Sequence, residues 1–160
     1  MNPKPMTESR WIPVSILLGT GIFLLALAVS AASVLQLRLL HVFQALIYLV
    51  VIFLTRRNSA WGFGAGVVIA TAWNILNLFV THLFYAGAGQ LWILLHGGKV
   101  TRLDTMMVFV GSLGHFLLIV ACMAGFLQLR PGKKQWGQFV GGGLLVLAYM
   151  VLIVATMAPR

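Results

Sequence analysis

Four histidines are the side chains of this sequence best suited to metal or haem chemistry: His41, His82, His96 and His115. A neutral imidazole ring is a good ligand for metal ions and for haem iron. His41 and His82 are expected at similar depth on neighbouring helices. They could therefore ligate a b-type haem, or bind a metal ion together with His96. The spacing matches no established motif, and histidine also packs between helices as a hydrogen-bonding residue.

Amide and hydroxyl side chains within apolar stretches form a second candidate set. Asn74 and Asn77 are three residues apart, as are Ser112 and His115. Polar side chains in lipid prefer the interior of a bundle, where they find partners. We therefore predict that one group of side chains faces inward together: Gln44, Asn74, Asn77, Ser112 and His115. This group is either a hydrogen-bond network that fixes helix register or a pocket for a quinone headgroup, a lipid or a small solute.

Catalytic constellations are not found in the sequence. The two acidic residues, Glu8 and Asp104, lie outside the apolar stretches, which argues against a carboxylate-driven pump. There is no Ser-His-Asp set, Cys-His pair, P-loop or His-Glu-x-x-His motif. The single cysteine, Cys122, lies in an apolar stretch and is interpreted as a packing residue. An enzymatic role is therefore not favoured.

The composition excludes a soluble fold. Of the 160 residues, 61% are hydrophobic and 8% are charged, whereas soluble domains carry about 25% charged residues. The net charge of +9 comes from basic residues at the ends of apolar stretches, where they meet lipid headgroups. We therefore expect the lipid bilayer, and not nucleic acid, as partner. No linker divides the chain, so residues 1–160 are predicted to form a single transmembrane helical domain.

Five apolar stretches without charged residues define the expected fold class. A helix needs about 20 apolar residues to cross a bilayer. In lipid the backbone N–H and C=O groups must be hydrogen-bonded within the protein, so such a stretch forms a helix. We predict an all-α bundle of five transmembrane helices at about 12–35, 39–54, 63–84, 106–127 and 139–157. A short helix is expected near 90–96, lying in the interface as a cover bracketed by glycines.

The distribution of lysine and arginine predicts the orientation. With five spans, seven basic residues fall on the side of the N-terminus and four on the other side. The positive-inside rule then places the N-terminus in the cytoplasm and the C-terminus outside, in a bacterial inner (plasma) membrane. An alternative is that the first stretch is a signal peptide, because the small residues 28–33 resemble a cleavage site.

These observations favour a non-catalytic subunit or accessory component of a membrane complex. Glycines such as Gly137 and Gly141 would let the last helix approach another subunit or a second copy closely, although packing within the chain is the favoured explanation for them. Two alternatives remain. One is an electron-transfer or quinone-site protein that holds haem b or a metal ion. The other is a transporter or binding protein for a small molecule or lipid.

Overall fold

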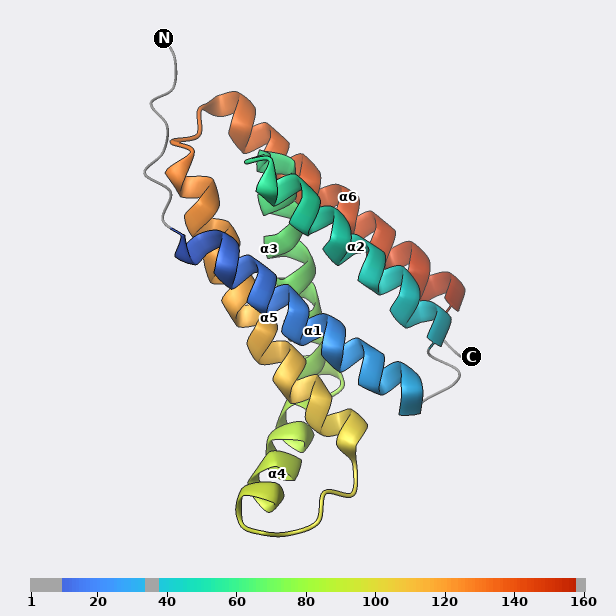
Figure 1. Ribbon diagram of the computed structural model, residues 1–160. Coiled ribbons are helices and arrows are strands. Elements are labelled where there is room, and N and C mark those ends of the chain that lie inside the picture. Colours follow the sequence, from blue (N-terminus) through green and yellow to red (C-terminus); the bar gives the residue numbers. More distant parts are fainter. Residues whose placement is uncertain (1–9, 34–37, 158–160) are drawn as a thin grey trace.

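The computed structural model describes residues 10–33 and 38–157, and the elements in these ranges are all helical (Figure 1). The connection at 34–37, where the sequence predicts a tight hairpin, lies outside the described residues, as do Lys4 and Arg160. The elements are α1 (Trp11–Ser33), α2 (Arg38–Arg56), α3 (Ala60–Ile75), the π-helical segment η2 (Leu76–Val80), α4 (Leu83–Leu95), α5 (Leu103–Gln128) and α6 (Lys133–Met157).

Five of these helical segments are long and apolar enough to cross a bilayer. They are Trp11–Ala32, Arg38–Arg56, Ala60–Val80, Leu103–Gln128 and Lys133–Thr156. Large apolar side chains are exposed on their outer faces, as expected where lipid and not water is the solvent. The protein is therefore an all-helical, multi-pass membrane protein, and the predicted fold class is confirmed.

Helices α1 and α5 form one closely packed pair, and two glycines at their crossing make this possible. A methyl group at Gly19 would lie 2.6 Å from the carbonyl oxygen of Gly114, and one at Gly114 would lie 2.7 Å from the carbonyl oxygen of Gly19. Only hydrogen fits at these positions. The two backbones therefore touch, as small residues allow helices to do in lipid.

Helices α3 and α6 form the second closely packed pair. A side chain at Gly64 would meet the backbone of Phe139, and one at Gly142 would meet the backbone of Trp61. The Trp61 ring also covers Gly141. The glycines of the last helix, which the sequence offered as a contact for another subunit, thus lie mainly against α3. Gly137 is the exception, because a methyl group added there would meet no other described part of the protein within 4 Å.

Helix α2 lies along α6 and next to α3 and α1, and it closes the bundle (Figure 1). Its inward residues recur every three or four positions, as an amphipathic helix requires; they are Leu40, Gln44, Ile47, Tyr48, Val51 and Thr55. At its first residue, Arg38 Nε donates a hydrogen bond of 2.9 Å to the carbonyl oxygen of Ala31 at the end of α1.

The third predicted helix, 63–84, ends earlier than expected, and the short helix predicted near 90–96 is longer. The span stops at Val80, and α4 covers Leu83–Leu95. Between them, His82 has a left-handed backbone with φ 55°. The Thr81 hydroxyl donates to the carbonyl oxygen of Leu76 at 3.2 Å and accepts from the amide of Leu83 at 3.5 Å. Such local bonds compete with helix continuation, which explains the break.

The two ends of the bundle differ in the elements they expose. One end contains the start of α1 and the α2–α3 and α5–α6 connections (Figure 1). We call it the basic end because most of the described basic residues lie there: Arg10, Arg56, Arg57, Arg130, Lys133 and Lys134. The other, the α4 end, contains α4 and the start of α5, together with Arg38, Lys99 and Arg102.

Candidate functional site

A chain of hydrogen bonds crosses the centre of the bundle and links three helices. Tyr48 Oη on α2 lies 2.7 Å from His115 Nε2 on α5, and His115 Nδ1 lies 3.3 Å from Asn74 Oδ1 on α3. Asn74 Nδ2 donates to the carbonyl oxygen of Ser112 at 3.3 Å, and Asn77 Nδ2 donates to the Ser112 hydroxyl at 3.4 Å. These contacts fix the register of α2, α3 and α5 relative to one another.

The protonation of His115 follows from its neighbours. The Ser112 carbonyl oxygen only accepts hydrogen bonds, so the Asn74 amide must present its NH₂ group there and its oxygen to His115. The His115 Nδ1 atom is then the protonated donor. The ring is buried among apolar groups, where an isolated charge is costly, and in the neutral ring Nε2 accepts the hydrogen of the Tyr48 hydroxyl group.

Apolar packing buries the Tyr48 and His115 side chains of this network. Tyr48 and His115 are each 0% exposed. The ring of Phe23 on α1 lies on both, with centroid distances of 4.5 Å to Tyr48 and 4.0 Å to His115. A ligand entering the bundle would meet Phe23 before it reached the imidazole. The network therefore has the character of a structural core and not of an open reaction site.

A cavity of about 430 Å³ lies on the α4-end side of this network. Ligand pockets in proteins usually measure about 300–1,000 Å³. The wall comes from α1, α2, α3, η2, the first residue of α4 and the first turns of α5, and most of it is apolar. The lining side chains include Phe23, Ala26, Leu27, Leu40, His41, Gln44, Trp73, Leu76, Asn77, Met107 and Val108.

Three of the lining residues carry a buried polar atom that has no hydrogen-bond partner in the described part of the chain. They are His41 Nδ1, Gln44 Oε1 and Trp73 Nε1. Leaving a buried donor or acceptor unpaired costs about 1–3 kcal/mol. Most buried polar groups in folded proteins are satisfied, so these three atoms are exceptions that the contacts within the described part of the chain do not account for.

An ion pair stands at the rim of the cavity. Arg102 donates to both carboxylate oxygens of Asp104, at 3.3 Å from Nε and 3.1 Å from Nη2. This contact raises the pKa of the Arg102 guanidinium group above its ordinary value. Each charge of the pair therefore offsets the other at the rim.

Helix α4 and the loop that follows it lie beside this rim. A side chain at Gly87 would meet the backbone of Thr105 and the side chain of Phe109 on α5, so the helix sits directly against α5. The Gln90 side-chain oxygen accepts hydrogen bonds from the backbone amides of Thr101 and Arg102, at 3.0 and 3.2 Å. These bonds hold the loop over the start of α5.

The structure distributes the five predicted pocket residues between the network and the cavity. Asn74, Ser112 and His115 are buried in the network, and Gln44 lines the cavity. Asn77 belongs to both, because it bonds to Ser112 and also lines the cavity. The site role of this set stays a prediction.

The histidines are spread out. His41 lines the cavity, His115 lies in the network, and His82 is an exposed residue at the start of α4. His96 is exposed at the end of α4 and contacts the Trp92 carbonyl oxygen at 2.9 Å. Among the described residues, no group of three or more His, Cys, Asp or Glu side chains is placed to hold a metal ion.

Tyr48 and Trp73 were missed by the sequence reasoning. Both read as ordinary apolar residues of a membrane helix. Their positions carried one usable signal, since Tyr48 lies four residues after Gln44 and Trp73 directly precedes Asn74. Aromatic residues with a polar tip usually find a hydrogen-bond partner when buried, so their placement beside polar residues could have been taken into account.

Comparison of the chain with known protein families, with curated proteins and with solved structures gave no match.

Proposed function

We propose that this membrane protein binds a small amphipathic molecule in the cavity at its α4 end. The observation that carries the proposal is the presence of unpaired polar atoms on His41, Gln44 and Trp73, three residues of a mostly apolar wall. A ligand-binding pocket characteristically combines a mostly apolar lining with a few convergent polar groups.

The chemistry of the wall defines the class of ligand. The Gln44 oxygen requires a donor, and the Trp73 N–H group requires an acceptor. An uncharged polar group that both donates and accepts, such as a hydroxyl or an amide, meets both needs. The apolar wall, which includes Leu27, Leu76 and Val108, matches a hydrocarbon or aromatic body. Binding without chemistry is the role, since the polar groups present form no catalytic set.

The orientation proposed from the sequence predicts in which half of the bilayer the cavity lies. If the basic end faces the cytoplasm of a bacterial inner membrane, the cavity belongs to the outer half of the bilayer. Its ligand would then come from the outer leaflet or from the outer aqueous side.

Native mass spectrometry of the protein, purified from its own membrane in mild detergent, tests the proposal. We expect a small molecule bound one to one, which the variant Val108→Trp loses because the indole ring fills the cavity. Val151→Trp is the matched control, since Val151 is 59% exposed on α6 and does not line the cavity. A wild-type protein that carries no adduct, or equal binding by both variants, would contradict the proposal.

A second candidate is the accessory-subunit role expected from the sequence. It is favoured by α4, which leaves apolar side chains exposed beyond the five spans, including Tyr85, Trp92 and Leu95. Purification in mild detergent would then recover the protein in a larger particle, and the triple variant Tyr85→Ser, Trp92→Ser, Leu95→Ser would release it. The haem alternative has its own measurement, an absorption spectrum, in which bound haem gives a Soret band.

A further inference from the structure

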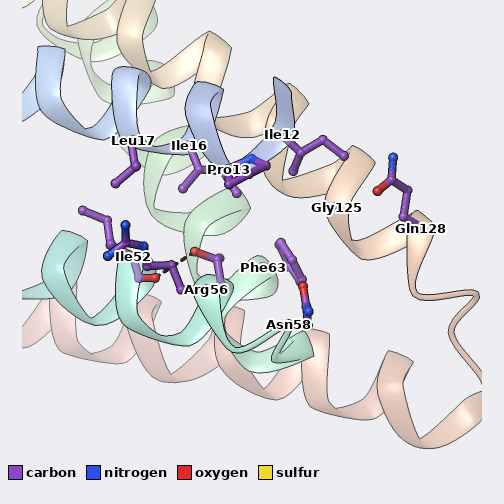
Figure 2. A pocket seen from close by; sticks show the side chains of 11 residues that line it. Ile12, Pro13, Ile16, Leu17, Ile52, Arg56, Asn58, Phe63, Gly125 and Gln128 are labelled. Carbon is purple, nitrogen blue, oxygen red and sulfur yellow. Dashed lines mark hydrogen bonds between the residues drawn. The ribbon is translucent and has the colours of Figure 1, made fainter. Parts of the chain in front are cut away.

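A second, smaller cavity opens at the basic end of the bundle, between α1, α2, α3 and α5. Its volume is about 140 Å³. Figure 2 shows that side chains of α1 and α2 face each other across it, with Ile16 and Leu17 opposite Ile52. The floor is apolar, and Phe63 lies at its α3 side.

The outer margin of this cavity is polar and carries an arginine. Arg56, Asn58 and Gln128 line the cavity, and all three residues are exposed. The Arg56 side chain has no hydrogen bond or ion pair with any other described residue. The guanidinium group of its neighbour Arg57 lies over the Phe53 ring at 4.2 Å instead, and Arg57 does not line the cavity.

The charge of the surroundings reinforces this margin. Of the chain's two acidic residues, Asp104 is at the α4 end, paired with Arg102. Among the described residues of the basic end there is no carboxylate that could neutralise Arg56. The exposed guanidinium group of Arg56 offers several N–H donors in one place, and Figure 2 shows it on the side of the cavity where Leu17 and Ile52 lie. Such a set suits a phosphate group, which guanidinium binds through paired hydrogen bonds.

We infer that this cavity binds one anionic phospholipid: the phosphate at Arg56, and the first part of an acyl chain along Ile16, Leu17 and Ile52. The two parts of the site match the two parts of such a lipid. A cation stands at the end of the helices, where headgroups lie, and the apolar floor extends inward from it. The inference rests on this end of the bundle alone and does not depend on the α4-end cavity.

The test uses the full-length protein in a neutral detergent and native mass spectrometry with added dioleoyl phosphatidylglycerol. We expect one tightly held lipid, which Arg56→Gln weakens by roughly tenfold because a charge-assisted hydrogen bond is lost. Arg57→Gln is the matched control: it removes the same charge one residue away but leaves the cavity intact, so we expect unchanged binding. Arg56 and Arg57 are exposed, so both variants should fold.

A second pair of variants tests the acyl-chain part. Leu17→Trp fills the cavity and should weaken lipid binding, whereas Leu18→Trp, at an exposed position outside the cavity, should not. Inorganic phosphate is then added as a competitor. Because the acyl chain contributes to binding, millimolar phosphate should not displace the lipid.

Four results would overturn the inference. They are the absence of a retained lipid on the wild-type protein, equal weakening by Arg56→Gln and Arg57→Gln, equal affinity for the zwitterionic dioleoyl phosphatidylcholine, and displacement by phosphate with no effect of Leu17→Trp. The second would indicate general surface attraction. The fourth would indicate a site for free phosphate.

Discussion

The Tyr48 hydroxyl group and His115 Nε2 are 2.7 Å apart, and this hydrogen bond joins α2 to α5 at the centre of the bundle. The variant Tyr48→Phe removes the donor and leaves a buried imidazole nitrogen unpaired. We expect it to lower the free energy of unfolding by about 1–3 kcal/mol, measured by equilibrium unfolding in mixed micelles. Tyr85→Phe is the control, because Tyr85 is 58% exposed; equal losses in both would refute the importance of the bond.

The two asparagines should differ in their contribution to stability. Asn74 is buried and bonds to both His115 and the Ser112 backbone, whereas Asn77 makes one longer bond to the Ser112 hydroxyl. Asn74→Leu leaves the His115 N–H group without an acceptor and should cost about 1–3 kcal/mol. Asn77→Leu should cost less but should weaken ligand binding, since Asn77 lines the cavity. Thermal unfolding and ligand retention, measured on both variants, would test this order; the reverse order would contradict the network.

Two glycines on α1 should respond in opposite directions to the same substitution. Gly19→Ala places a methyl group 2.6 Å from the Gly114 carbonyl oxygen, so α1 and α5 must separate, at a cost of roughly 1–3 kcal/mol. A methyl group added at Gly21 would meet nothing within 4 Å outside its own stretch of helix. Gly21→Ala should therefore be neutral or stabilise the helix by up to about 1 kcal/mol. The midpoint of thermal unfolding distinguishes the two. A stabilised Gly19→Ala protein would show that the helices are not in contact there.

Gln44 provides a test of the unpaired oxygen that supports the proposed binding role. In protein stripped of lipid and ligand, Gln44→Leu removes an unsatisfied buried carbonyl group and should raise the free energy of unfolding by about 1–3 kcal/mol. The same variant should lose affinity for the ligand. If it were instead destabilised when empty, the Gln44 oxygen would have a partner within the protein, and the proposal would lose its main support.

The proposed orientation can be tested by thiol labelling. Cys122 is 0% exposed, so the natural background of labelling should be low. In intact cells a membrane-impermeant maleimide should label Lys99→Cys, whereas Arg57→Cys and Gly132→Cys should react only after permeabilisation. The opposite pattern at these positions would place the basic end outside the cell.

The sequence was sufficient for the five spans because each one is determined by a physical requirement that acts locally. A charge-free apolar stretch of this length must form a helix in lipid, whatever its neighbours. The inward direction of Asn74, Ser112 and His115 was accessible for the same reason, since polar groups avoid lipid. The pairing of donors with acceptors could not be predicted from the sequence, because the Tyr48–His115 hydrogen bond depends on how α2 packs against α5.

The break after Val80 shows a different limit. The sequence has neither glycine nor proline between Gly66 and Gly87, so no ordinary helix-ending residue marks the start of α4. The chain turns instead through the Thr81 hydroxyl bonds and the left-handed His82. Asparagine and histidine tolerate that conformation better than most residues, but only the packing of α4 against α5 decides that it is adopted here.

The neutral His115 ring bears on how the protein responds to transmembrane voltage. Moving one elementary charge across 100 mV involves about 2.3 kcal/mol. The apolar stretches contain no Lys, Arg, Asp or Glu, and the complete burial of His115 favours an uncharged ring. Rearrangements among α1, α2 and α5 would therefore transfer no net charge through the membrane field. A change of membrane potential alone should therefore leave the packing of these helices unchanged in energised and de-energised cells.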